Sequence, residues 1–431
     1  MTDKNQYSSR LGAILTMVGV AVGLGNVWRF PYMMGTYGGS AFLFIYLIFT
    51  VLLAFPALLT EMTLGQQSKT GTLSAYRSLY GNKYGKALGY LLIGVVTIAG
   101  SYYAVVVANV FFSAGFSVVT GFSADTNTQH QDLLSNGLLQ YGFTILLIIL
   151  SLYVSYKGLK KGIERISKFI IPFFLLSILY IIAHTWMMPG AIDSVKTFLS
   201  PDFSAVGSTE VFAALGQAFF SIGLGGTFVV VYASYIKNEN DIPRIAILTC
   251  LGDLGSSLLV SLFLVPSILI LNMKMDAGPS LIFNTLPELF TVLPGGRFVG
   301  SLFLISLSLV AFLSLIAAFQ VPISSLTGLK VPTKKLIIGF GILQIVLAFP
   351  SAMYPEIIGV LDLVFGSGMQ VFGSMLAVVG MWWGVKQDLF RKMLFTNPVS
   401  RFAVFSMFWL KWIVPGTLVA VLIGYIYQSL S

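Results

Sequence analysis

Residues 19–31, GVAVGLGNVWRFP, decide the fold, because they interrupt an apolar segment that is otherwise long enough to cross a membrane. Three glycines stand in this stretch, and each destabilises a helix by about 1 kcal/mol relative to alanine. Asn26 and Arg29 follow, where hydrocarbon disfavours polar groups. We therefore expect two shorter helices whose free carbonyl and N–H groups meet at the break. Inside a membrane such backbone must line a cavity or be buried in protein, so the stretch predicts half of a binding site.

The composition indicates an all-α integral membrane protein. Of the 431 residues, 56% are hydrophobic and 10% are charged, with a mean hydropathy of +0.88. The single cysteine, Cys250, excludes an internal disulfide. The first ten residues lack the apolar core of a signal peptide, so we expect the first span to be retained. The net charge of +9 is explained by membrane orientation and does not indicate a nucleic-acid partner.

Segments of about 20 apolar residues predict eleven transmembrane helices. They lie near residues 11–35, 40–66, 85–121, 139–156, 167–188, 210–236, 242–272, 297–327, 334–351, 357–384 and 404–428. The segment 278–293 is too short to span and contains several prolines, so we expect a helical hairpin on the outer face.

The distribution of Lys and Arg predicts the orientation in the bilayer. With the N-terminus in the cytoplasm, the outer loops hold only Lys196, Lys274 and Arg297. By the positive-inside rule this asymmetry fixes that orientation, and eleven spans then place the C-terminus outside. We expect a multi-pass protein of the plasma membrane or the bacterial inner membrane.

A second glycine-rich interruption, QAFFSIGLGGT at residues 217–227, lies in the sixth predicted span. The first and sixth spans open the two halves of a five-plus-five arrangement, with repeats at about 10–190 and 205–385 and an extra helix at about 404–428. Paired glycine-broken spans in two halves indicate a transporter's substrate site, and an odd number of spans per half makes the repeat inverted. The chain 1–431 is therefore expected to form one transporter domain.

Four runs resemble the signatures of the neurotransmitter:sodium symporter family, and the resemblance covers nearly the whole chain. They are residues 19–31, GGSAF at 38–42, GLKKGIER at 158–165 and SPDF at 200–203. The chain most resembles the bacterial members with eleven spans that carry amino acids. The resemblance implies a LeuT-like inverted repeat whose first and sixth helices are unwound at mid-membrane. It also implies sodium-driven symport of an amino acid by alternating access.

The resemblance also implies two sodium sites. The first is carried over to Ala21, Asn26, Ser221 and a seventh-span residue that is either Asp253 or, one turn earlier, Thr249. The second is carried over to Gly19, Val22, Val310 and Ser314, but Leu313 stands where an oxygen ligand is expected, which puts the second sodium in doubt. An intramembrane carboxylate is costly and by default functional, so we expect Asp253 to supply the negative charge that chloride supplies in other members. The alternative is a structural Asp that caps a helix.

The substrate site and the gates are inferred in the same way. Arg29 and Asp362 match the outer ion pair, and Tyr103 and Phe220 match the aromatic lid. The expected substrate contacts are Val20, Ala21, Gly23, Leu24, Gly25, Ala99, Tyr103, Phe220, Ser221, Gly223, Gly226, Ser314 and Ala318. Because Ala99, Gly223, Gly226 and Ala318 are all small, we expect a large, aromatic or hydrophobic, neutral L-amino acid. The alternative is that these small residues only let helices approach closely.

Several further residues match the family around these sites. Glu61 is expected to hydrogen-bond the unwound backbone, while Tyr46 and Gln217 lie where the family places neutral groups near an anion. Gly162 and Pro172 match the spacing at which the fifth span unwinds. On the inner side, Lys4, Tyr7 and Arg10 resemble half of a gate, but Gly328 stands where its acidic partner is expected.

Competing functions have less support from the sequence. A carrier of small aliphatic amino acids or amines is the nearest alternative, followed remotely by a channel. An enzyme is not expected, because the only histidines are His130 and His184 and no catalytic constellation is present. ATP-driven transport would require a phosphate-binding Gly-x-x-x-x-Gly-Lys-Ser/Thr loop in this chain, which the sequence lacks. The oligomeric state is left open.

Overall fold

The computed structural model describes residues 6–237, 241–274, 278, 280–327, 331–384 and 400–430. Every regular element in those ranges is helical, as the hydropathy pattern predicts. In chain order the helices are α1 (Arg10–Ala21), α2 (Leu24–Val27), α3 (Arg29–Thr36), α4 (Ser40–Phe49), η2 (Thr50–Ala54), α5 (Phe55–Ser68), α6 (Thr72–Val119), α7 (Ala124–Leu134), α8 (Gly137–Tyr156), η3 (Leu159–Ile163), α9 (Glu164–Trp186), α10 (Ala191–Leu199), η4 (Phe203–Ala205), α11 (Ser208–Ser221), α12 (Phe228–Ala233), α13 (Ile242–Ile270), η6 (Leu281–Thr285), α14 (Leu286–Val292), α15 (Gly296–Leu326), α16 (Thr333–Met353), α17 (Ile357–Leu361), η7 (Asp362–Gly368), α18 (Met369–Trp382), α20 (Arg401–Phe408), η8 (Trp409–Ile413) and α21 (Val414–Leu430).

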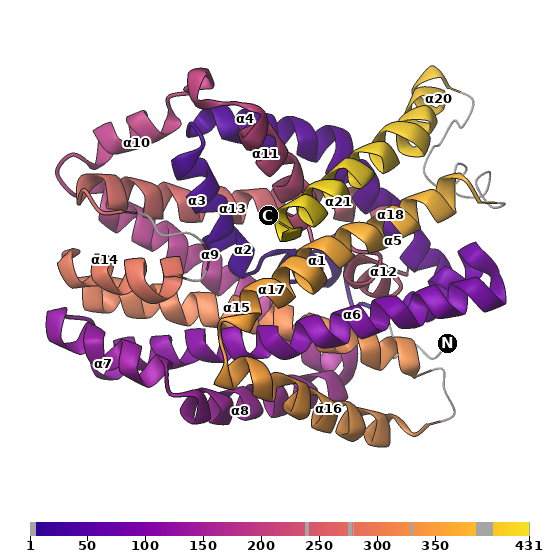
Figure 1. Cartoon of the computed structure of the whole chain (residues 1–431), viewed down its shortest axis with the longest axis horizontal. Coiled ribbons are helices and arrows are strands. Elements are labelled where there is room, and N and C mark those ends of the chain that lie inside the picture. Colours follow the sequence, from indigo (N-terminus) through magenta and orange to yellow (C-terminus); the bar gives the residue numbers. More distant parts are fainter. Residues whose placement is uncertain are drawn as a thin grey trace.

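The broken first span passes through the middle of the bundle (Figure 1). Its first half, α1, packs against α9, α13 and α15, which places it among helices from both halves of the chain. Around this centre, α15 packs on α6, α16 covers α6 and α8, and α21 lies along α18. The two broken spans are therefore held inside protein, which is the environment that interrupted helices need.

Both predicted interruptions are present in the backbone. Helix α1 ends at Ala21, α2 begins at Leu24, and the two halves of the span are bent by 68°. Helix α11 ends at Ser221 and α12 begins at Phe228. In the second break Gly223 has φ +69° and Gly226 has φ +66°, a region that side chains disfavour. The glycines thus let the chain reverse without strain.

The span count and one outer element differ from the expectation. Nine helices of the described residues are long and apolar enough to span a membrane, or ten if the bent first span is counted. The sixth predicted span is not among them, because it is divided into the separate helices α11 and α12. The hairpin expected at 278–293 is wrong for the described residues, which form a single short helix, Leu281–Val292. Pro287 lies inside this helix, just after the π-helical turn η6, and the chain stays helical through it.

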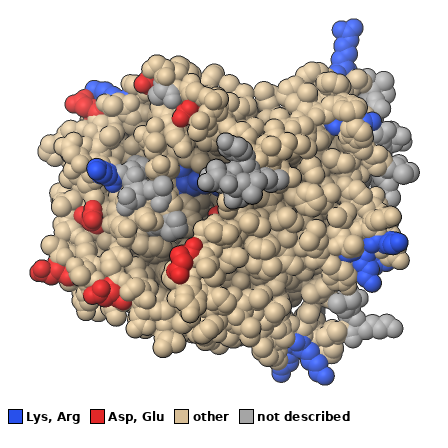
Figure 2. All heavy atoms as spheres, viewed as in Figure 1, with Lys and Arg blue, Asp and Glu red and all other residues tan. Residues whose placement is uncertain are grey.

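Charge is distributed unevenly between the two ends of the bundle. On the face shown in Figure 2, most Lys and Arg side chains lie at the right-hand end, where Figure 1 marks the N-terminus. Most Asp and Glu side chains on that face lie at the opposite end, where Figure 1 shows α7, α10 and α14. By the positive-inside rule the end with the Lys and Arg side chains is the one expected to face the cytoplasm, and this orientation stays a prediction.

Candidate functional site

Four polar side chains from three spans meet beside the break in the first span. The Asn26 amide nitrogen on α2 donates hydrogen bonds to Asp253 Oδ1 at 2.6 Å and to Ser257 Oγ at 2.7 Å. Ser221, the last residue of α11, donates to Asp253 Oδ2 at 2.7 Å. The Asn26 Oδ1 atom accepts from the N–H of Gly23 at 2.8 Å, which ties the amide to the interrupted backbone. The structure thus joins both broken spans to α13.

The chemistry of this cluster fits a sodium ion. Asp253 is only 1% exposed, and the side chains that hydrogen-bond its carboxylate, Asn26 and Ser221, are both neutral. A buried carboxylate without an opposite charge is strongly disfavoured, so a cation is the natural complement. The Asp253 carboxylate and the Ser221 and Ser257 hydroxyls are oxygen groups, which suit a hard cation. The Asn26 oxygen accepts from the Gly23 N–H, and the Ala21 carbonyl stays a predicted ligand. Among the described residues no group of His, Cys, Asp and Glu has the arrangement of a transition-metal site.

Of the two seventh-span candidates, the structure brings Asp253 into the cluster. Thr249 lies one turn earlier on α13 and is buried, and its hydroxyl donates to the Ile245 carbonyl of its own helix at 2.8 Å. Ser257 lies one turn later and takes a place that the sequence analysis did not assign. Positions four apart share a helix face, so the spacing from Asp253 was the available signal for Ser257.

The second sodium site is only partly present. Ser314 Oγ on α15 donates to the Val22 carbonyl at 3.1 Å, and Val310 lies one turn earlier on the same helix. Leu313, which is 4% exposed, points at Gly19: a Cβ built on Gly19 would lie 3.0 Å from Leu313 Cδ1. Hydrocarbon therefore occupies the side from which an oxygen ligand would come. The residues present do not fit a second sodium with the full ligand set.

Residues expected to contact the substrate surround the break in the first span. A Cβ built on Gly23 would lie 3.2 Å from Ser314 Oγ and 3.6 Å from Tyr103 Oη. A Cβ built on Gly25 would lie 2.8 Å from the Phe220 ring. The backbone at the break is left uncovered only because Gly23 and Gly25 have no side chains. The remaining backbone positions of this set, Val20 and Leu24, flank the same break.

The substrate contact expected at Gly226 stays a prediction, but a side chain at this position would point into packed protein. A Cβ built on Gly226 would lie 1.9 Å from the Tyr76 hydroxyl and 2.7 Å from the Gly373 carbonyl, which are themselves hydrogen-bonded at 2.8 Å. Gly226 is therefore a close-packing position. Gly223 differs, because a Cβ there would meet nothing within 4 Å. Ala99 and Ala318 are buried, and a Cβ on Gly100 would lie 3.6 Å from that of Ala318, so α6 and α15 approach closely here.

The outer gate residues lie together, but they are paired differently from the expectation. Arg29 places its guanidinium 4.6 Å from the centre of the Phe220 ring and donates from Nη2 to Tyr425 Oη at 3.2 Å. Asp362 instead accepts a hydrogen bond from Tyr102 at 3.1 Å. The described residues contain no ion pair between Arg29 and Asp362. Tyr425 lies in the extra helix outside the repeat, so no repeat-based signal pointed to it.

The acid and the neutral groups of the flanking helices follow the expectation. Glu61 on α5 is fully buried and accepts from the N–H of Gly225 at 3.1 Å, which confirms that it holds the unwound backbone. Tyr46 and Gln217 are also fully buried. The Tyr46 hydroxyl and both polar atoms of Gln217 have no hydrogen-bond partner in the described part of the chain.

The end of the bundle at which α1 begins, expected to be the inner end, is closed by contacts of the segment before α1. Tyr7 donates from its N–H to the Tyr235 carbonyl at 3.3 Å and from its hydroxyl to the Tyr232 carbonyl at 3.2 Å. Arg10 pairs with Asp241 at 2.5 Å. Lys4 and Gly328 lie outside the described residues. Gly162 falls in η3 and Pro172 lies inside α9, so the fifth span contains both features expected to ease its unwinding.

Comparisons with known proteins identify the kind of molecule that has this arrangement. The model of the sodium:neurotransmitter symporter family matches residues 4–125 and 117–430. An uncharacterized sodium-dependent transporter of Bacillus subtilis, YhdH, is 28% identical over 81% of this chain and 78% of its own length. Another from Methanocaldococcus jannaschii is 30% identical over 75% of this chain and 70% of its own. The crystal structure of MhsT in complex with L-phenylalanine matches with a TM-score of 0.86 and 26% identity, covering 97% of this chain and 99% of that one.

Proposed function

The chain belongs to the sodium:neurotransmitter symporter family, and we propose that it carries a neutral L-amino acid together with a sodium ion held at Asn26, Ser221 and Asp253. Sodium-coupled transport follows from the family and from its sodium-dependent relatives. The observation that supports the ion site most strongly is the buried carboxylate of Asp253, whose hydrogen-bond partners are neutral oxygen and nitrogen groups at both helix breaks. Sodium supplies the missing positive charge there.

The same geometry accounts for the substrate's two charged ends. The N–H groups at the start of α2 carry partial positive charge and favour a carboxylate, with the Tyr103 hydroxyl as a further donor. Carbonyl groups at the ends of α1 and α11 carry partial negative charge and favour the ammonium group. A charged side chain would lack a partner, because the expected contact set contains no Asp, Glu, Lys, Arg or His.

The test is transport by purified protein in liposomes. We expect accumulation of a neutral amino acid against its gradient only when sodium is higher on the side from which uptake occurs. Accumulation should fail when potassium or choline replaces sodium. Flux that continues without any ion gradient, at rates typical of pores, would instead establish the channel alternative.

We propose a large, aromatic or hydrophobic side chain for the substrate. The supporting facts are the L-phenylalanine in the MhsT structure, the Phe220 wall and the open space at Gly223. Ala318→Ile places a larger side chain beside α6. The substrate preference should shift from Trp or Tyr towards Leu or Ala, by about 1 to 3 kcal/mol. Gly339→Ile is the matched control, because it adds the same side chain at an exposed position of α16 with nothing within 4 Å.

The competing substrate class makes an opposite prediction. A carrier of small aliphatic amino acids or amines would already prefer alanine, glycine or an amine in its wild-type form. An Ala318→Ile variant that keeps its aromatic preference unchanged would show that Ala318 of α15 does not line the substrate pocket. Competition among a panel of amino acids and amines for binding of one labelled substrate distinguishes these outcomes.

A further inference from the structure

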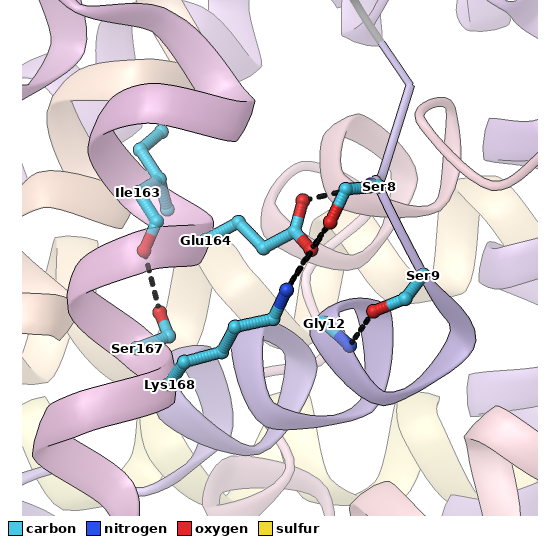
Figure 3. Close-up of polar contacts among 7 residues, drawn as sticks. All are labelled: Ser8, Ser9, Gly12, Ile163, Glu164, Ser167 and Lys168. Carbon is cyan, nitrogen blue, oxygen red and sulfur yellow. Dashed lines mark hydrogen bonds and ion pairs between the residues drawn. The ribbon is translucent and has the colours of Figure 1, made fainter.

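The inner end of the fifth span carries a buried carboxylate that the transport site does not use. Glu164 is the first residue of α9, and its side chain is only 1% exposed. It accepts hydrogen bonds from the Ser8 N–H at 2.9 Å and from the Ser8 hydroxyl, and it pairs with Lys168 Nζ at 2.7 Å (Figure 3). Lys168 also donates to Ser8 Oγ at 3.1 Å. The three residues form a closed network that joins α9 to the segment preceding α1.

The backbone of α1 is shaped to accept this carboxylate. A Cβ built on Gly12 would lie 1.8 Å from Glu164 Oε1, so the carboxylate lies directly against the glycine backbone. Ser9 caps the helix by accepting from the Gly12 N–H at 3.0 Å, which fixes the first turn of α1 in the same place (Figure 3). The segment before α1 and the first turn of α1 therefore cover Glu164 from solvent. Separation of α1 from α9 would expose the carboxylate and break its bonds to Ser8.

The position of the network is what gives it a role in gating. It connects the inner half of the broken first span to the inner end of the fifth, where η3 follows Gly158 at φ +77°. The start of α1 also forms an ion pair, between Arg10 and Asp241. This pair is weaker, because Arg10 is 48% exposed and surface ion pairs contribute little to stability. Glu164 is buried, and hydrogen bonds to buried charged groups contribute more than neutral ones.

We propose that Glu164 is an inner-gate residue of this chain, which holds the inner pathway closed by binding Ser8 over Gly12. This inference rests on the proposed function, because a gate has meaning only in a carrier that opens alternately to each side. Glu164 acts by positioning α1 and does not touch the substrate. Release of Ser8 lets α1 leave α9 while the fifth span unwinds behind it.

The experiment measures access to the inner pathway separately from transport. In a Cys250→Ala background, Ala13→Cys places a thiol on the buried face of α1, where the wild-type residue is 3% exposed. A membrane-impermeant thiol reagent is applied from the inner side in sodium. We expect Glu164→Ala and Gly12→Ala each to raise the labelling rate by about tenfold, which corresponds to the loss of one hydrogen bond to a charged group.

Two further variants separate gating from general loss of structure. Alanine is a better helix former than glycine, so Gly12→Ala should fold and act only through its clash with Glu164. The double variant should label no faster than Glu164→Ala alone, because the added methyl then has no carboxylate to displace. Glu164→Gln keeps an acceptor for Ser8 and should label at an intermediate rate. Lys196→Ala, which breaks the exposed pair with Asp193 on α10, should not change the rate.

The outcomes for the gate and for the proposed function differ. Labelling that stays at the wild-type rate in both single variants would overturn the gate, even if sodium-driven uptake is normal. Additive rates in the double variant would also overturn it, because the two residues would then act independently. If the wild-type protein accumulates no amino acid in sodium, the proposed function fails, while the labelling comparison still decides whether Glu164 closes the inner pathway.

Discussion

Either the Asp253 carboxylate or a bound chloride ion can balance the charge of sodium in this site. The first arrangement needs no chloride, whereas the second does. In the structure the Asp253 carboxylate contacts Asn26 and Ser221, so its charge is available to balance sodium without an anion. Nearby, the Tyr46 hydroxyl and the Gln217 amide are buried without partners in the described residues, and both groups are able to donate to an anion. Gln217 lies one turn before Ser221 on α11. We infer a site in which the Asp253 side chain has taken the place of an anion.

We therefore predict that Asp253→Ser makes transport depend on chloride. Without chloride, uptake should fall by about thirtyfold or more, because removing one partner of a buried charge pair costs at least about 2 kcal/mol. Added chloride should restore much of it by using the donors of Tyr46 and Gln217. Asp193→Ser, at an exposed acid on α10, is the control. Full activity of Asp253→Ser in gluconate medium would show that this carboxylate does not replace chloride.

Leu313 carries the second prediction at this scale. Its side chain faces Gly19, where the family places a ligand oxygen for a second sodium. Leu313→Thr should supply that oxygen, raise the apparent sodium affinity and move the Hill coefficient for sodium from about 1 towards 2. The measurement is sodium dependence of substrate binding at equilibrium. Leu309→Thr, at a half-buried position of the same helix, should leave both quantities unchanged. A wild-type coefficient already near 2 would contradict the single-site expectation.

At the scale of the element, η3 and helix α9 together carry two features that would ease the unwinding expected at their inner end. Gly162 lies in η3, and Pro172 interrupts the hydrogen bonding of α9. Helix α9 packs against α1, α13 and α15. A proline in a helix interior costs about 3 kcal/mol relative to alanine. That cost is present in the closed state and is partly relieved when the inner segment opens.

We predict that Pro172→Ala slows turnover several-fold while leaving sodium affinity unchanged. The restored N–H strengthens α9, which makes unwinding less favourable, and the ion site on α2, α11 and α13 is not touched. Initial uptake rates and equilibrium binding measured on the same preparation separate the two effects. Pro350→Ala, inside α16, removes a proline from a helix away from the site and serves as the control. A weaker sodium affinity in Pro172→Ala would indicate that the proline shapes the site instead.

The elements also show what the sequence is able to predict. The two helix breaks were predictable because glycines and polar residues interrupt apolar segments locally. Leu313 was identifiable only through the family resemblance, which places an oxygen ligand at that position. The direction of Gly226 was not, because φ of +66° in an unwound segment turns it towards Tyr76, which lies far away in the sequence. Likewise, the bond from Arg29 to Tyr425 joins residues 396 apart, and pairings across a bundle leave no local pattern.

For the whole molecule, the two ends of the transport path differ in how firmly they are closed. At the expected inner end, contacts of Tyr7, Ser8 and Arg10 join the first span to α12, to α9 and to Asp241, the residue that precedes α13. At the outer end Arg29 and Asp362 are held by tyrosines of different helices and form no ion pair in the described part of the chain. The structure thus combines firm contacts at the expected inner end with two charges of the expected outer gate that are not paired with each other.

Helix α7, which we call the outer cap, makes the stability of the folded protein depend on pH through His130. This residue of α7 is fully buried against Phe112, Phe116 and Phe122, and one ring nitrogen bonds Ser113 of α6 at 2.9 Å. Burial lowers its pKa from about 6.5 to about 4. The folded protein therefore holds His130 neutral in a pH range where the unfolded chain binds a proton.

The resulting dependence has a definite sign. Because the unfolded state takes up more protons between about pH 6.5 and 4, His130's contribution to stability is complete above that window and is lost as pH falls through it. We predict that the melting temperature in detergent declines between pH 7 and pH 4.5, and that His130→Gln makes the decline shallower because glutamine cannot be protonated. His184→Gln controls for the loss of a histidine elsewhere on the outer side. Equal slopes in wild type and His130→Gln would show that α7 separates from α6 without exposing His130, so that the cap and the bundle unfold independently.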